Sequence, residues 1–501
     1  INLKIKFIFF LFIATIKMSS PSSLPAILNV ATIPTIENMN VKTEVLDPIT
    51  ISSTQAIFQI PKTGILDGGS MLQLGVRADP TQFFPLTTGI HGLIKSVFLK
   101  VGGKVLASND DYAYYTTMTR QFDTPEHRAY VDMVKSGACG DRWGVVKSGR
   151  LAPRDLDGTI GDVQTNDTFN VPTMFRPTLS DDTTPLFTIP LSTLLPMMRS
   201  RQLPLLAIKD HVYLEVNFNT QAANAPGKIV CSKKNEDAKS AVFLSTPNIK
   251  FISDHLYYSA PQMTGIVQQT LSAQGLSVLY EDLITTYASV PLVATPGANQ
   301  VVPQVVERQI AVSGKTVRNI MVQMKDQNAN HPVLGEYISR DLIVPTAYNL
   351  RINDQRIYDR DVQAPPRKYM ELQQVMGKPL MCPSQVYSYD TDSDKQATPS
   401  LRLNQTSMTV GKVEDYQMVS AALADTDGDL RATSSYIGYD ATTSGVNTLG
   451  NGARIGVKPI ALQLTLTRGD PESQRSARDL RIFTGVERVF NLRNGEITIS
   501  A

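Results

Sequence analysis

The chain has 501 residues, of which 42% are hydrophobic and 19% are charged. This is enough apolar material for compact cores and too little charge for a disordered chain. The length exceeds that of one ordinary β-sandwich, so two domains of similar size are expected. The 48 basic and 46 acidic residues leave a net charge of +2 and are interspersed along the sequence. Nucleic-acid-binding proteins concentrate Lys and Arg in a patch, so we expect no specific nucleic-acid binding.

The N-terminal seventeen residues contain an apolar run from Phe7 to Ile13 and no Met. This run is far shorter than the roughly 20 residues that span a bilayer, although it has the length of a signal-peptide core. Met18 is followed directly by a Ser- and Pro-rich stretch. We expect that residues 1–17 are an untranslated or leader segment and that residues 18–44 form an N-terminal arm. A signal peptide is the alternative.

Alternation of apolar and polar residues predicts β-strands over most of the chain. In residues 211–218, apolar side chains occupy every second position from Val212 to Phe218, which is typical of a half-buried antiparallel strand. Residues 461–467 repeat the pattern. Further strands are predicted at residues 51–60, 71–76, 93–101, 316–324, 348–352, 480–484 and 496–499. The 30 Pro and 31 Gly mark turns between these short runs and favour an all-β fold.

Few helices are predicted, and each has clear start signals. Asn109 can cap one helix, and Thr124, followed by Pro125, can cap a second that reaches about Lys135. Pro365 opens a third, which ends before Gly377. Apolar side chains share one stripe in the first and third helices: Tyr112, Tyr115, Met118 and Phe122 in the first, and Tyr369, Leu372 and Met376 in the third.

A pattern in the first half of the chain recurs in the second half. Residues 99–106 form a predicted strand, a Gly-Gly turn and a second strand, and a predicted helix follows. Residues 350–357 repeat this order with an Asn-Asp turn, and a helix follows again. Both turns use residues that accept positive φ, as tight hairpins require. This repetition about 250 residues apart predicts a duplicated domain, with residues 99–106 and 350–357 in equivalent places.

Linkers and loops are predicted where polar, Gly-rich stretches interrupt the strands. The two halves are expected to join between Thr220 and Lys239, where turn-forming and charged residues gather. Long surface loops are predicted at residues 137–167, 384–400 and 425–454.

Residues that could bind metal or catalyse a reaction form no recognisable motif. The three cysteines are Cys139, Cys231 and Cys382. They lie too far apart for the Cys-x-x-Cys spacing of metal sites, and their odd number argues against a complete disulfide framework. A reducing cytosol fits this cysteine content best. Five histidines stand alone and are expected to be ordinary hydrogen-bonding residues: His91, His127, His211, His255 and His331.

Two Asp-rich segments suggest calcium but lack the loop pattern that calcium sites need. In the first, counted with Asp425 as position one, Gly428 is fourth and Tyr436 twelfth, where an EF-hand has Gly at six and Glu at twelve. The second, from Asp390, has Lys395 where Gly belongs. Two glycosylation triplets, at Asn166 and Asn404, arise often by chance. We therefore predict no catalytic, cofactor-binding or metal-binding residue.

A long stretch near the first predicted hairpin resembles a known protein family. Residues 91–108, continuing to Arg128, are similar to the double jelly-roll major capsid proteins of polinton-like viruses, virophages and nucleocytoplasmic large DNA viruses. Residues 189–195 and 201–208 with the strand at 211–218 resemble the close of the family's first jelly roll. The similarity extends from about Val45 to the C-terminus and is firmest before Asn219.

This resemblance implies two eight-stranded antiparallel jelly-roll β-sandwiches in tandem, with few short helices. It places the first jelly roll at residues 45–220, a linker at 221–245 and the second jelly roll at 246–501. It further implies a homotrimer of pseudo-hexagonal outline that tiles an icosahedral shell, because six similar domains fill a hexagonal tile.

The same resemblance implies a set of partners and a location. The partners would be copies of the chain itself, penton proteins, minor capsid or cement proteins and, in some relatives, an internal membrane. The protein would belong to the virion and be made in the host cytoplasm or nucleus. It would be a structural protein and not an enzyme, without cofactors, and the family has no catalytic residues to carry over.

The main alternative is a carbohydrate-binding or glycan-processing β-sandwich, since jelly rolls also serve as lectins and enzyme modules. Such a protein should carry exposed aromatic residues on a concave face or a close pair of carboxylates in a cleft. The sequence has a single Trp, Trp143, which favours the capsid interpretation. A secreted adhesin is a third possibility and requires a working signal peptide.

Overall fold

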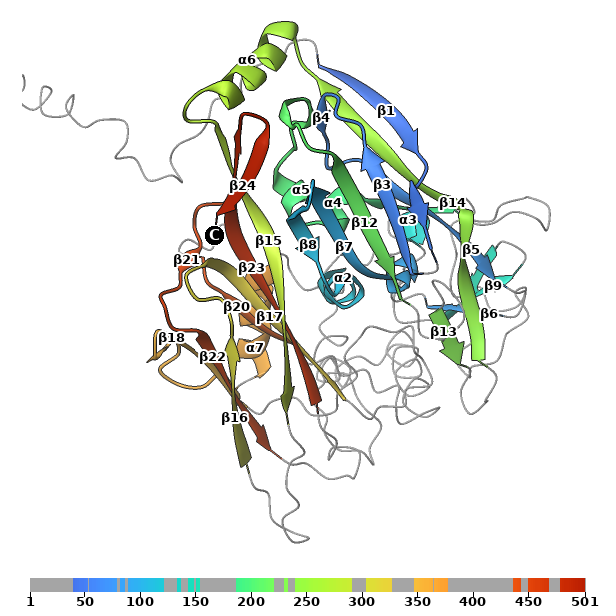
Figure 1. Ribbon diagram of the computed structural model, residues 1–501. Coiled ribbons are helices and arrows are strands. Elements are labelled where there is room, and N and C mark those ends of the chain that lie inside the picture. Colours follow the sequence, from blue (N-terminus) through green and yellow to red (C-terminus); the bar gives the residue numbers. More distant parts are fainter. Residues whose placement is uncertain are drawn as a thin grey trace, which may run out of the picture.

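The computed structural model describes residues 39–52, 54–78, 82–85, 89–120, 133–136, 143–147, 150–153, 186–219, 229–232, 239–290, 303–326, 347–363, 365–376, 436–442, 449–467 and 478–500. Strands dominate this part of the chain and helices are few and short (Figure 1). All pairings between its named strands are antiparallel, as the sequence predicts: β1 to β24 form sheets without a parallel pair.

Eight strands from the first half of the chain form two facing sheets. In chain order they are β1 (Asn40–Leu46), β3 (Gln55–Ile60), β5 (Met71–Ala78), β7 (Ile94–Val101), β8 (Lys104–Asn109), β11 (Leu186–Pro190), β12 (Val212–Phe218) and β14 (Lys239–Tyr257). One sheet has the order β1-β14-β5-β11 and the other β3-β12-β7-β8. Ranked by position in the chain, these orders are 1-8-3-6 and 2-7-4-5.

Eight strands from the second half repeat this arrangement. They are β15 (Leu276–Val290), β16 (Pro303–Ile310), β17 (Thr316–Asp326), β18 (Ala347–Ile352), β19 (Gln355–Arg356), β20 (Tyr436–Asp440), β22 (Ile460–Thr467) and β23 (Arg478–Arg493). Their sheets have the orders β15-β23-β17-β20 and β16-β22-β18-β19, which are again 1-8-3-6 and 2-7-4-5. Two antiparallel sandwiches of eight strands with the same strand order form a double jelly roll, so the fold prediction is confirmed.

Short strands either pair with strands of these sheets or form a separate three-stranded sheet. Near the first sandwich lie β2 (Thr50–Ile51), β4 (Ile65–Leu66), β6 (Gln82–Pro85), β9 (Trp143–Lys147), β10 (Arg150–Pro153) and β13 (Ile229–Ser232). The strands β21 (Ala453–Arg454) and β24 (Glu496–Ser500) extend the second. The predicted loops at residues 137–167 and 425–454 therefore contain strand residues of β9, β10, β20 and β21, and the predicted loop at 384–400 lies outside the described residues.

The duplicated hairpin lies where the sequence predicts it. The β7–β8 and β18–β19 hairpins occupy the fourth and fifth positions of their jelly rolls. Positive φ values at Gly102 (59°), Asn353 (52°) and Asp354 (66°) show why these turns use residues that tolerate the left-handed region. Each hairpin is followed by a helix, α2 (Tyr112–Arg120) in the first half and α7 (Pro365–Met376) in the second. The equivalence of the two segments is confirmed.

The strands between residues 229 and 257 belong to the first sandwich. Both β13 and β14 lie in its β1-β14-β5-β11 sheet, and β14 pairs with β5 and β1. The predicted linker at 221–245 thus includes residues of β13 and β14, which are strands of the first jelly roll. The predicted start of the second jelly roll, from residue 246, includes the rest of β14. The helix α6 (Ala260–Leu271) separates β14 from β15. We propose that the division falls at residues 258–275, and that the N-terminal arm ends before β1.

Other short helices lie between the strands of the first half of the chain. They are η3 (Gly89–Leu93), α3 (Met133–Ser136), α4 (Leu191–Leu194), α5 (Met197–Ser200) and η6 (Leu205–Ala207). Only residues 133–136 of the second predicted helix are described, and they are helical.

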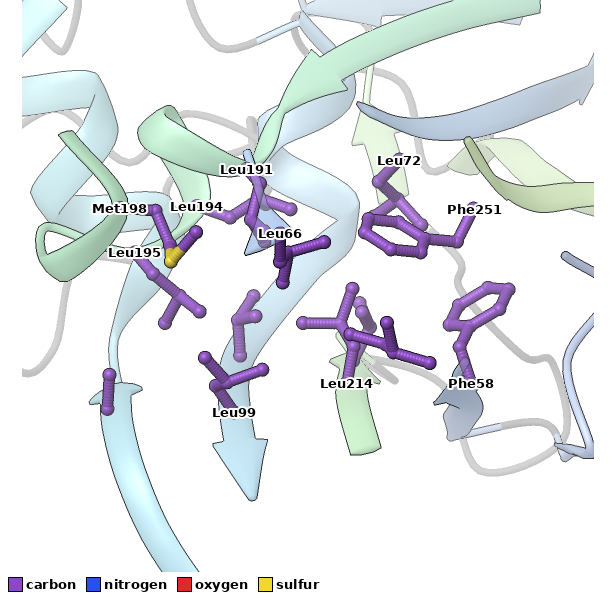
Figure 2. Close-up of a cluster of buried hydrophobic side chains, with 14 of the residues drawn as sticks. Phe58, Leu66, Leu72, Leu99, Leu191, Leu194, Leu195, Met198, Leu214 and Phe251 are labelled. Carbon is purple, nitrogen blue, oxygen red and sulfur yellow. The ribbon is translucent and has the colours of Figure 1, made fainter. Parts of the chain in front are cut away.

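The core of the first sandwich is filled by alternate side chains of its strands and by these helices. Phe58 of β3 and Phe251 of β14 face each other across the two sheets, with ring centroids 5.9 Å apart. Figure 2 shows Leu191, Leu194, Leu195 and Met198 from the α4–α5 region pointing into the same cluster. In the second sandwich, Val306, Val322, Leu350, Leu462 and Ile482 belong to a separate core.

Candidate functional site

The two sandwiches meet along a buried interface, which is the candidate functional site. The first sandwich contributes β8, α2 and α5, and the second contributes β15, β23 and β24. Figure 1 shows the long strands β15 and β23 running beside β8 and α2. The position of each jelly roll relative to the other therefore depends on the side chains of these elements.

Apolar side chains make the interface continuous with the core of the first sandwich. Tyr280, Phe490, Leu492 and Ile497 of the second sandwich are buried among first-sandwich residues. The rings of Tyr280 and Phe490 lie 5.8 Å apart, and the Tyr280 hydroxyl donates a hydrogen bond of 2.8 Å to the carbonyl of Leu106. This bond satisfies the one polar atom of a fully buried ring.

The two equivalent helices, α2 and α7, contribute to one further apolar cluster. Tyr115 and Met118 of α2 and Leu372 of α7 share it with Phe483 of β23. The rings of Tyr115 and Phe483 lie 5.5 Å apart at 59°. Because Tyr115, Met118 and Leu372 occupy the apolar stripes predicted from the sequence, those stripes correspond to buried surfaces.

Arg481 of β23 joins the second sandwich to the start of α2. Its Nε donates a hydrogen bond of 2.7 Å to Oδ2 of Asp111, and its Cζ lies 3.7 Å from the centre of the Tyr114 ring. A guanidinium combines an ion pair with stacking on an aromatic face, which Lys does not do equally well. Asp111 lies directly before α2, so this pair fixes the position of the helix on β23.

Asp282 of β15 is a buried carboxylate at the same interface. Its Oδ1 accepts a hydrogen bond of 3.3 Å from the backbone N–H of Ser108 in β8, and its Oδ2 lies 2.7 Å from Nη1 of Arg488. Burial raises the pKa of Asp282 to about 6, and the Arg488 charge opposes this rise. The carboxylate therefore links the two sandwiches and changes charge in a mildly acidic range.

A second group of charges lies next to Asp282 on the same sheet. The Arg318 side chain is 3% exposed, and its Nη1 donates to Oε2 of Glu281 at 2.6 Å. Its Nε lies 3.7 Å from Oε1 of Glu487, which also accepts a hydrogen bond of 2.8 Å from the backbone N–H of Gly450. Buried ion pairs add little net stability, but removing one partner is costly because the other charge stays buried. The group therefore holds β15, β17 and β23 in one register.

The C-terminal hairpin of β23 and β24 binds the second sandwich to the first through hydrogen bonds. The backbone N–H of Lys209 donates 2.9 Å to the carbonyl of Gly495, and Nζ of Lys104 donates 3.0 Å to the carbonyl of Ile497. Asn494, in the same turn, donates its backbone N–H to Thr270 at the end of α6. Together these contacts connect both sandwiches and the helix between them.

The described histidines, Cys231 and Trp143 make none of the interface contacts described above. The described histidines each have a nearby hydrogen-bonding group: Nδ1 of His91 lies 2.6 Å from the Tyr112 hydroxyl, Nδ1 of His211 lies 3.0 Å from Nε2 of Gln59, and His255 contacts Ser253 and the carbonyl of Thr63. Cys231 lies in β13 and Trp143 in β9. Outside the described residues lie His127, His331, Cys139, Cys382, Asn166, Asn404 and the Asp-rich segments from Asp390 and Asp425.

The interface charges were missed in the sequence, although a signal was present. Glu281-Asp282 and Glu487-Arg488 each interrupt an otherwise apolar or alternating run. Within the described residues, no three His, Cys, Asp or Glu side chains are grouped as metal ligands would be. Among the helices of that same part of the chain, none has the length and apolar character needed to cross a bilayer.

Comparisons with known proteins find similarity among solved structures only. No protein-family model matches the sequence, and a search of curated proteins finds no match either. Among solved structures, a chain of the PBCV-1 virus capsid matches with a TM-score of 0.53 and 11% identity, covering 93% of this chain and 97% of that one. PBCV-1 VP54, fitted into a reconstruction of the virophage Sputnik, matches with a TM-score of 0.51, 11% identity and the same coverage.

A chain of the Sputnik virophage itself matches with a TM-score of 0.50 and 11% identity, covering 92% of this chain and 88% of that one. At this identity the similarity concerns the fold, which extends over both jelly rolls. The chain therefore has the double jelly-roll fold of the PBCV-1 capsid chain and of the Sputnik virophage chain.

Proposed function

We propose that the chain is a structural virion protein, the major capsid protein of an icosahedral DNA virus. The observation that carries the proposal is the pair of jelly rolls with one strand order, held together by a buried interface. Similarity of fold to a PBCV-1 capsid chain over 93% of the sequence supports it.

The geometry suits a building block of a shell. Three copies of a chain with two similar domains supply six similar units, which fill a hexagonal tile with threefold symmetry. Such a tile keeps its shape only if the two domains of each chain stay fixed. The apolar contacts of Tyr280 and Phe490, the Arg481–Asp111 ion pair and the hydrogen bond from Ser108 to Asp282 supply that rigidity.

The partners follow from this role. They are two further copies in a homotrimer, neighbouring trimers in the shell, penton proteins at the vertices and minor capsid or cement proteins, with an internal membrane in some viruses. The site of action is the virion, after synthesis in the host cytoplasm or nucleus. The role is structural, without catalytic residues or cofactors.

The molar mass of the purified full-length protein tests the proposal. Light scattering should give three times the 55.0-kDa chain mass, and this mass should persist on dilution. A glycan-binding assay on the same sample tests the carbohydrate-binding alternative. A stable monomer that binds an oligosaccharide would contradict the capsid assignment.

A further inference from the structure

We propose that β1 forms a contact between two copies of the chain, in which the β1 strands pair antiparallel about a twofold axis through Thr43. The inference rests on the proposed function, because it assigns this contact to neighbouring capsomers in the shell. The surface is the edge of the first sandwich, and the partner is the same edge of a second copy.

The strand β1 lies at the edge of its sheet. It is the first strand of the order β1-β14-β5-β11, and among the described residues its backbone pairs with β14 alone. Figure 1 shows β1 at the outer margin of the first sandwich, with β14 on its inner side. The N–H and C=O groups of an edge strand are a template for a further strand.

Apolar side chains gather at this edge. On β1, Val41 is 46% exposed and Val45 is 59% exposed, and both lie on the face opposite to Leu46, which packs against the core. Further along the chain, Ile49 is 57% exposed. A cluster of exposed aliphatic residues on an edge is expected to be covered in the working assembly.

The sequence of β1 is complementary to itself when one copy is reversed. Pairing about Thr43 places Val41 opposite Val45 of the second copy and Lys42 opposite Glu44 of the second copy. Lys42 and Glu44 already form an ion pair of 2.5 Å within one strand, with Lys42 59% exposed. The twofold pair would therefore bring together four charges of alternating sign, flanked by two pairs of valines.

This complementarity identifies the occupant as a second copy. Directly opposite residues in an antiparallel pair interact most strongly, and both opposite charges and aliphatic pairs stabilise it. A twofold contact uses the same patch on both partners, so the patch must complement itself. Charges on an edge strand can also serve to prevent pairing, and the experiment below distinguishes these two roles.

Charge-exchange variants of the full-length protein test the pairing. In Lys42→Glu, two acidic residues of one copy would face two acidic residues of the other, and in Glu44→Lys the repulsion is between basic residues. The double variant Lys42→Glu/Glu44→Lys restores opposite charges across the axis. An equimolar mixture of the two single variants also restores them, but only between unlike copies.

Sedimentation velocity would measure how the protein associates beyond its basic oligomer as its concentration rises. We expect each single variant to associate at least about tenfold more weakly than the wild type. The double variant and the mixture should both recover association. Wild-type association should weaken as salt rises from 0.05 to about 0.5 M, because exposed charges are screened.

Amide hydrogen exchange over residues 39–51 gives the matching structural measurement. Exchange should slow in the associated wild type and not in Lys42→Glu. The proposal is overturned if the single variants associate as the wild type does, if the mixture fails to recover, or if these amides stay unprotected. The mass of the basic oligomer, measured in dilute solution, tests the trimer separately, so failure of one is distinguishable from failure of the other.

Discussion

Charged residues lie inside the interface between the two sandwiches, where they replace part of the apolar contact. There Arg481 forms an ion pair with Asp111. Asp282 forms an ion pair with Arg488 and accepts a hydrogen bond from the backbone N–H of Ser108. An ion pair has strict geometry, whereas apolar side chains can pack in several ways. At the scale of single residues, the Arg481–Asp111 ion pair and the hydrogen bond from Ser108 to Asp282 therefore determine how the two jelly rolls are oriented.

Arg481→Ala tests this role. The change removes the ion pair with Asp111 and the contact with the Tyr114 ring, and leaves the largely buried Asp111 carboxylate without its nearby positive charge. We expect a loss of about 2–3 kcal/mol in the free energy of unfolding, measured by urea denaturation. The control is Arg351→Ala, whose exposed ion pair with Glu307 should contribute at most about 0.5 kcal/mol. Equal losses in the two variants would refute the assigned role.

Asp282→Asn tests the buried carboxylate through its dependence on pH. The pKa of Asp282 in the folded protein, about 6, exceeds the ordinary value of 3.8. Its contribution to stability is therefore complete below pH 4 and is lost as pH rises through 6. The asparagine variant does not titrate, so its stability relative to the wild type should rise between pH 4 and 7, by on the order of 2 kcal/mol. A relative stability that is flat or falls over this range would contradict the assignment.

Strands with strict alternation were predicted accurately, whereas the long strands β14 and β15 were missed. β12 alternates between buried and half-buried residues over its whole length, as expected for residues 211–218. β15 was missed because Glu281 and Asp282 interrupt its pattern, and their burial is explained only by Arg318 and Arg488 on other strands. β14 was missed because Pro247 falls at a register shift between Ser245 and Lys250.

Gly495→Ala tests the C-terminal hairpin as an element. Gly495 has a φ of 82°, and an added Cβ would lie 2.5 Å from Cγ of Lys209 in the first sandwich. We expect a loss of about 1–2 kcal/mol from backbone strain, with a further loss from displaced contacts. The control is Gly103→Ala in the β7–β8 turn, where an added Cβ would meet no atom within 4 Å. Thermal unfolding would compare the melting temperatures of the two variants. Similar melting temperatures would argue against a role of the C-terminal hairpin in joining the sandwiches.

At the scale of the whole molecule, the duplication was visible in the sequence, whereas the division proposed here at residues 258–275 was not. The paired hairpins at residues 99–106 and 350–357 were recognisable because turn residues and strand patterns are local. The boundary depends on β14 completing the first sandwich between β1 and β5, which are more than 150 residues earlier in the chain. Pairing over such distances leaves no local pattern, so the polar stretch near residue 230 was taken for a linker.

Electron microscopy of material assembled from the purified full-length protein tests the central claim most directly. We expect capsomers of pseudo-hexagonal outline with six similar lobes, arranged in sheets or closed shells. Reconstruction should place two jelly rolls of one chain in adjacent lobes, with β15 and β23 against α2. Particles without hexagonal capsomers at every salt concentration and pH tried would contradict it.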